Sequence, residues 1–297
     1  MPELKVDSRV AGARFSPHEF SWNWQDSQLI ARAAGCSIAD PLDRPLLWPE
    51  SGAPGHPMIV FNGALLARNR PEVMDRLIGG YDNWQRVGRW GSTHTRFLRP
   101  PARAGHAAVE CGFTETGVTS KGHALVRFAF EVNEMPSGER LADGWMLLFL
   151  LGCGSAALGK LAPPSIAMPE RGADVVVAHE TPVNVTFDWA MASADWNTTH
   201  FETREGNPAP LVYGTRNMAL VIGDAARVFA AGAPARLRQI TLGNLAAPLY
   251  PQESTETRMW REGAGRILAR LVVPPKARID GGAGEKIVID QIEIHLD

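Results

Sequence analysis

The chain has 297 residues, 45% of them hydrophobic, and its 30 basic and 32 acidic residues give a formal net charge of -2. This length fits one large domain or two modules of ordinary size, and the composition is normal for a folded protein. Because the charges nearly balance, no electrostatic argument favours nucleic acid or an anionic membrane as a partner, and we predict neither.

The cysteines and the chain ends predict a cytoplasmic protein. Cys36, Cys111 and Cys153 are widely spaced and odd in number. They match neither a disulfide framework nor the ligand spacing of a metal site, so we expect buried thiols and no metal. Residues 1–7 lack the apolar core of a signal peptide, and the longest apolar run, Trp145 to Leu151, is too short to span a bilayer.

The first part of the chain predicts helices followed by strands. Helical patterns cover Trp24 to Gly35, Met58 to Arg68 and Glu72 to Ile78. From about Val87 the apolar period changes to that of strands. Helices followed by meandering strands indicate an α+β fold with an antiparallel sheet. The predicted strands are Thr93 to Phe97, Ala107 to Thr116, Ala124 to Val132 and Trp145 to Leu151.

The same order returns in the second part of the chain. A proline-rich stretch at 161–172 is typical of a linker, and Thr215 to Ala231 carries one apolar face at helical spacing. Strand patterns then cover Leu237 to Ala246, Ser254 to Arg261, Arg266 to Val273 and Ile287 to His295. Two halves with helices first and strands second indicate a duplicated fold, with modules at 1–160 and 173–297.

A cluster of polar residues precedes the second helical segment. Asp195, Asn197 and His200 form a D-x-N-x-x-H pattern, and a Tyr213-Gly214 step follows at the start of the helix. A carboxylate and an imidazole can exchange protons, and an amide at a helix N-terminus can donate to a developing negative charge. These groups suit the addition of water to a polarised double bond. Turn and capping chemistry is the alternative interpretation, because Asp and Asn favour tight turns.

This motif resembles the signature of the (R)-specific enoyl-CoA hydratases, the hydratase 2 or MaoC-like group. The group's pattern is S-G-D-x-N-P-L-H followed by a His-Gly step, and similar segments run from about Phe20 to Val273. The resemblance implies a tandem (double) hot-dog fold, in which two antiparallel sheets each wrap a central helix. The second module would be catalytic, and the degenerate first module would accommodate the acyl chain. It further implies an acyl-CoA thioester substrate, no cofactor beyond the CoA of that substrate, and a homodimer.

The resemblance also assigns roles by position. Asp195 and His200 would hold and activate one water molecule, and the Gly214 amide would donate to the thioester oxygen. Asn197 would orient the loop or the water. For substrate contacts we expect Tyr213 and Thr215, beside the glycine, and His94, from a strand of the first module. A hydrogen-bonded strand histidine is the alternative for His94.

The motif departs from the group's pattern at several positions. Ala194 replaces a glycine, Thr198-Thr199 replaces Pro-Leu, and Tyr213 replaces the histidine before Gly214. These changes leave open a protein that binds acyl thioesters without hydrating them, and a thioesterase is a further alternative.

The acyl group is not defined by the sequence: a long fatty chain, a steroid side chain and a short dicarboxylate all fit. Tyr213 with nearby Arg204 and Arg216 favours a polar or short group.

Overall fold

The structure is a computed structural model that describes residues 4–48, 52–203 and 206–297. Within these ranges the helices are α1 (Trp24–Ala33), α2 (Arg44–Leu47), α3 (Met58–Arg68), α4 (Pro71–Ile78), α5 (Tyr81–Val87), α6 (Val185–Ser193) and α7 (Gly214–Phe229). The strands of the first half are β1 (Arg14–Trp22), β2 (Gly88–Phe97), β3 (Gly105–Val118), β4 (Ala124–Glu134) and β5 (Arg140–Leu150). Those of the second half are β6 (Val175–His179), β7 (Leu237–Leu245), β8 (Thr255–Arg261), β9 (Arg266–Val273) and β10 (Lys286–Leu296).

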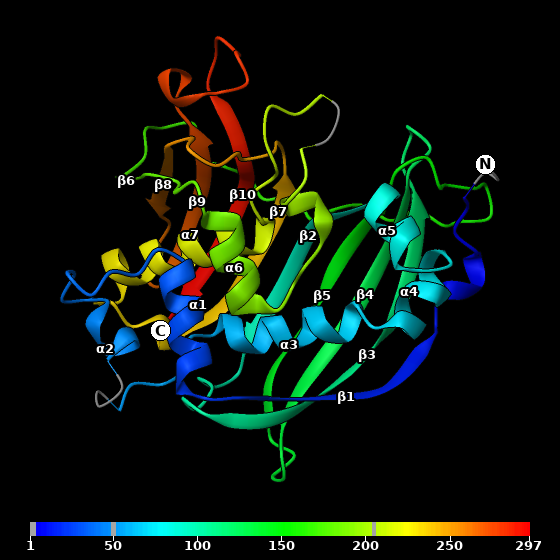
Figure 1. Cartoon of the computed structure of the whole chain (residues 1–297), viewed down its shortest axis with the longest axis horizontal. Coiled ribbons are helices and arrows are strands. Elements are labelled where there is room, and N and C mark those ends of the chain that lie inside the picture. Colours follow the sequence, from blue (N-terminus) through cyan, green and yellow to red (C-terminus); the bar gives the residue numbers. More distant parts are fainter. Residues whose placement is uncertain (1–3, 49–51, 204–205) are drawn as a thin grey trace.

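All ten of these strands belong to one sheet, which the two halves build in the same way (Figure 1). The strand order is β1-β3-β4-β5-β2-β7-β10-β9-β8-β6. Read from either outer edge, each half places its first strand outermost and its second strand innermost. The duplication indicated by the sequence is therefore present in the topology. The two predicted sheets are joined edge to edge, and residues 151–174 between β5 and β6, all of them described, contain no helix or strand.

The innermost strands form the joint between the halves. β2 pairs antiparallel with β7 from Thr93 opposite Leu242 to Arg96 opposite Gln239. The pairing does not continue to Trp90, where β2 has a bulge in its register with β5. A bulge bends a strand and increases its twist, and here the ladder with β5 continues past it to Gly88 while the ladder with β7 does not. The two strands therefore separate at this end of the joint.

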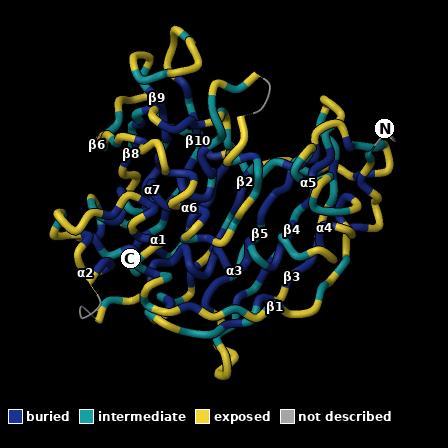
Figure 2. Tube along the Cα trace, viewed as in Figure 1, coloured by how far each residue is buried: buried dark blue, intermediate teal, exposed yellow. Residues whose placement is uncertain are grey.

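Each half has a central helix packed on the sheet. α3 contacts β1, β3, β4 and β5, and α7 contacts β7 to β10. Almost every side chain of α3 is buried, including Phe61 at 0% exposure, which is why this helix is apolar on all sides. Burying one such side chain contributes about 1.5–3 kcal/mol. Figure 2 shows the buried residues concentrated along these helices and the strands beneath them.

Several elements were not predicted from the sequence, among them the helices α2 and α5, the strand β1 and the helix α6. β1 was not predicted, because it is an edge strand with mostly exposed residues and contains Pro17 beside a register shift. α6 also lacks a recognisable apolar stripe. Trp189 is buried, whereas Phe187 and Met191 are about half exposed, at 52% and 54%.

In the described part of the chain no helix is long and apolar enough to cross a membrane. Cys36, Cys111 and Cys153 are buried free thiols, as the sequence predicted.

A buried histidine before α3 should make folding sensitive to acid. His56 is fully enclosed, and its Nδ1 accepts a hydrogen bond from the Met58 amide at 3.2 Å. Burial, aided by the charge of Arg227, lowers the pKa of His56 from its ordinary 6.5 to about 4. Between these values the unfolded chain binds a proton that the folded chain does not, so stability falls as the pH falls.

We expect the wild type to lose about 2 kcal/mol more unfolding free energy than His56→Asn between about pH 7 and about pH 5. Asparagine keeps an acceptor for the Met58 amide but does not titrate. Urea unfolding of both proteins at the two pH values measures the difference. Equal losses would show that His56 titrates normally in the folded chain.

Candidate active site

The loop after α6 is held in place by its own side chains. Ala194 ends α6 in the left-handed conformation, with φ 56°. The MaoC-like group, which the motif resembles, has glycine at this position. The next turn, Thr198–His200, is capped by Asn197, whose Oδ1 accepts from the Thr199 amide at 3.0 Å. The His200 amide donates to the Asn197 carbonyl at 3.0 Å. Asn197 therefore orients the loop, one of the two roles expected for it.

The imidazole of His200 is fixed through one ring nitrogen. Nδ1 lies 2.7 Å from the carbonyl oxygen of Leu211. Because a carbonyl can only accept, Nδ1 carries the proton, and in the neutral ring Nε2 is the basic nitrogen. On one face the ring stacks on Tyr213, with centroids 3.5 Å apart and planes at 24°.

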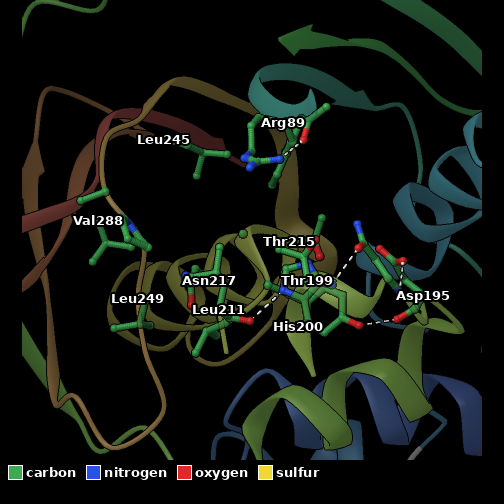
Figure 3. Close-up of a pocket in the computed structure, with 18 of the residues that line it drawn as sticks. Arg89, Asp195, Thr199, His200, Leu211, Thr215, Asn217, Leu245, Leu249 and Val288 are labelled. Carbon is green, nitrogen blue, oxygen red and sulfur yellow. Dashed lines mark hydrogen bonds between the residues drawn. The ribbon is translucent and has the colours of Figure 1, made fainter. Parts of the chain in front are cut away.

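Asp195 lies on the same loop and lines the same cavity as His200 (Figure 3). Its Oδ1 accepts from the Asn197 amide at 3.3 Å. Both residues are described, and no hydrogen bond or ion pair within 4.0 Å joins the carboxylate to the imidazole. Any proton that passes between them must therefore travel through a third group, such as a water molecule or a substrate atom.

The N-terminus of α7 supplies a backbone donor beside these groups. Gly214 is the first residue of the helix, and the first intrahelical bond runs from the Asn217 amide to the Tyr213 carbonyl at 3.1 Å. Among the described residues none accepts a hydrogen bond from the Gly214 amide. A helix N-terminus favours negative charge, so this amide can stabilise an oxyanion. A Cβ at Gly214 would lie only 3.0 Å from Cε3 of Trp90, so glycine keeps this wall close.

These groups meet in one cavity of about 430 Å³ that both halves of the chain enclose. It lies at the end of the joint where β2 and β7 separate, between Trp90 of β2 and Leu245 of β7. In Figure 3, Arg89 and Leu245 lie across the cavity from His200 and Thr215. The first half contributes Leu65, Arg68, Trp84, Gly88, Arg89 and Trp90. The polar motif and the start of α7 contribute Asp195, Asn197, Thr199, His200, Tyr213, Gly214, Thr215 and Asn217, and further residues of the second half complete the wall.

Comparisons with known proteins show which proteins this chain resembles in sequence and in structure. A scan against models of protein families finds no match. In sequence the chain is 22% identical over 265 residues to the peroxisomal multifunctional enzyme type 2 of Mus musculus, which covers 86% of this chain and 35% of the mouse protein.

Among solved structures, a MaoC-like dehydratase from Phytophthora capsici matches with a TM-score of 0.79 at 19% identity, over 97% of both chains. The full-length peroxisomal multifunctional enzyme type 2 of Drosophila melanogaster matches with a TM-score of 0.75 at 19% identity, over 95% of this chain and 48% of the fly chain. A conserved hypothetical protein of Mycobacterium tuberculosis with a double hot-dog fold matches with a TM-score of 0.59 at 14% identity, over 95% of this chain and 96% of that one.

This chain has a double hot-dog fold. In fold the chain resembles a MaoC-like dehydratase, the group that the motif indicated, and in sequence it is similar to a peroxisomal multifunctional enzyme type 2. The chain spans only 35% of the mouse enzyme and 48% of the fly chain. Those proteins therefore contain other parts that this chain does not match.

Tyr213, expected to contact substrate, lines the cavity and is also bonded within the loop. Its hydroxyl donates to the backbone carbonyl of Asp195, while its ring supports the imidazole of His200. Burial, with the nearby charge of Asp195, raises the pKa of Tyr213 well above its ordinary range, so the phenol keeps its proton. Tyr213 therefore positions both proposed catalytic residues. Thr215, also expected to contact substrate, lines the cavity, and its hydroxyl accepts from Nε1 of Trp189 at 2.9 Å.

Removing the hydroxyl of Tyr213 should separate its hydrogen bond to Asp195 from its stacking on His200. We expect Tyr213→Phe to keep the ring stacked on His200 but to release the Asp195 carbonyl, costing about 1–2 kcal/mol of stability. Looser placement of Asp195 should lower kcat roughly 10-fold and change KM less. Denaturant unfolding and steady-state kinetics on an enoyl thioester measure the two effects. Wild-type kcat in the variant would show that the hydroxyl does not position the loop.

Two further residues expected near the substrate, His94 and Arg216, do not line the cavity. His94 lines a separate groove with Arg96 and Trp145, and its Nδ1 lies 2.9 Å from the Thr241 hydroxyl, so the hydrogen-bonded strand histidine is the correct interpretation. Arg216 is buried, does not line the cavity, and donates from Nε to the Ala33 carbonyl at 3.4 Å. Arg204 lies outside the described residues.

The sequence did not identify the wall that the first half contributes. Arg68 ends an apolar helix, and tryptophans such as Trp84 and Trp90 most often serve as core or interface anchors. Asn217 lies in the first turn of α7, and its buried Oδ1 has no partner among the described residues. Its position one turn after Gly214 was the one signal that could have identified it. The described part of the chain contains no cluster of three His, Cys, Asp or Glu side chains suited to a metal ion.

Proposed function

We propose that this chain is a hydro-lyase that adds water reversibly to a trans-2-enoyl-CoA thioester and forms the (R)-3-hydroxyacyl thioester. The observation that carries the proposal is the single cavity in which Asp195, His200 and the Gly214 amide meet. It is further supported by the fold and by the sequence similarity to an enzyme of the same group.

In the proposed reaction, one water molecule lies between the Asp195 carboxylate and Nε2 of His200. Its oxygen bonds to Cβ of the substrate while one of its protons moves to this pair. The electrons of the double bond shift toward the thioester oxygen, where the Gly214 amide stabilises the enolate. A proton then returns from the pair to Cα, so one water is added in total. No redox step is required, since the thioester carbonyl accepts the electrons.

Turnover of a panel of trans-2-enoyl-CoA thioesters tests the proposal. Loss of the enoyl absorbance with formation of the (R)-3-hydroxyacyl product would support it. Release of free thiol would instead indicate a thioesterase.

The alternative is a protein that binds acyl thioesters without hydrating them. It is favoured by Tyr213, whose hydroxyl is engaged by the backbone of Asp195 at a position where the resembling family has histidine. Tight binding across the panel without turnover would establish this alternative.

A further inference from the structure

The first half places two charged side chains, Arg68 and Arg89, in the cavity wall, and Arg68 is the more deeply buried of the two. Arg68 is the last residue of α3, lines the cavity and is only 5% exposed. Its neighbour in the sequence, Arg70, forms an ion pair with Glu72 at 3.1 Å. Arg68, in contrast, has no Asp or Glu oxygen within 4.0 Å among the described residues.

Neutral groups hold the guanidinium of Arg68 in a fixed orientation. Nε and Nη2 donate to Oδ1 of Asn69 at 3.0 and 2.7 Å, and the guanidinium carbon lies 5.1 Å from the ring centroid of Trp84. Nη1 makes no hydrogen bond with a described residue. Burial lowers the pKa of Arg68, and the charge of Asp195, which lines the same cavity, opposes that shift.

A buried cation without a nearby counter-charge is costly, and an anion that enters the cavity would relieve that cost. The planar fork of arginine matches a carboxylate particularly well. The guanidinium of Arg68 lines the cavity without an ion-pair partner among the described residues, and it is therefore the group on which binding of such an anion depends.

On the basis of the proposed hydratase function, we propose that Arg68 selects thioesters whose acyl group carries a carboxylate and pairs with that carboxylate. The phosphates of CoA are a less suitable partner. The pantetheine arm separates them from the thioester, whereas Arg68 lines the same cavity as Asp195, His200 and Gly214, where the thioester end is proposed to bind. Thioesters of pantetheine, which lack those phosphates, separate the two sources of negative charge.

Binding of saturated thioesters tests Arg68 without requiring turnover. Succinyl-CoA and glutaryl-CoA are compared with butyryl-CoA and valeryl-CoA, their neutral counterparts of equal chain length, by calorimetry on the full chain. We expect the acids to bind about 10- to 100-fold more tightly than their counterparts, and the same preference between the pantetheine thioesters. Arg68→Gln should abolish the preference, and Arg68→Lys should retain part of it, because it keeps the charge but loses the fork.

Arg76→Gln is the matched control, because Arg76 is exposed on α4 outside the cavity and should keep the full preference. Circular dichroism confirms that each variant is folded. Equal binding of acids and neutral thioesters by the wild type, or an unchanged preference in Arg68→Gln, would overturn the proposal. If Arg68→Gln weakens acidic and neutral CoA thioesters equally and leaves the pantetheine thioesters unchanged, Arg68 binds a phosphate of CoA and the proposal is also overturned. If acids are preferred but enoyl thioesters are not hydrated, only the proposed reaction fails.

Discussion

Replacement of His200 by glutamine should lower kcat for enoyl-thioester hydration at least ~100-fold, the usual effect of losing an acid or base. Glutamine can still donate a hydrogen bond toward the Leu211 carbonyl, which now fixes Nδ1 at 2.7 Å. It has no nitrogen that can take a proton from water. The loop should therefore keep its conformation while the chemistry fails.

Steady-state kinetics on the best enoyl thioester measure this effect, and binding of its saturated analogue shows whether the cavity is intact. His106→Gln is the matched control, because His106 pairs with Glu19 at the surface, 3.3 Å away. A variant at His200 with kcat near that of the wild type would remove the imidazole from the mechanism.

Asp195→Asn should reduce kcat by a similar factor, at least ~100-fold, because the amide keeps the shape of the carboxylate but cannot accept a proton. The Asp195 backbone carbonyl, which accepts from the Tyr213 hydroxyl, is unchanged by the substitution. Binding of the saturated thioester should therefore change little. Asp188→Asn, on the exposed side of α6 where its carboxylate accepts from Asn184 at 2.9 Å, is the control.

The double variant Asp195→Asn, His200→Gln decides whether the two residues act on one water molecule. If they do, the double variant should be about as slow as either single variant, because groups that act as a unit are not additive. Multiplied losses would mean that the two residues serve separate steps. That outcome would contradict the shared water of the proposed mechanism.

The sequence predicted the parts of the fold that its apolar spacing controls. α3 has the predicted bounds, Met58 to Arg68, and the repeated order of helices and strands gave the duplication. It did not predict β1, because that strand is exposed and contains Pro17, and it did not predict the pairing of β2 with β7. Pairing between distant edge strands depends on three-dimensional packing, which no local period records.

The candidate site, like the fold, was predicted from the sequence only in part. Asp195, Asn197, His200 and Gly214 are close in the sequence, and a motif could identify them before the structure placed them in one cavity. Arg68 comes from the other half and looks in the sequence like the polar end of a buried helix. His94 failed as a substrate contact because the alternation of a strand cannot tell which face of a sheet will border a cavity.

The cavity lies where β2 and β7 separate beside Trp90, so its shape depends on the register in which the two halves pair. A slip of one residue at this joint would turn the neighbouring side chains to the opposite face and displace the indole that now lies against Gly214. Substitutions in the middle of the sheet are therefore expected to inactivate the protein even though the loop that carries Asp195 and His200 keeps its conformation. Neither half, taken alone, has both walls of the pocket.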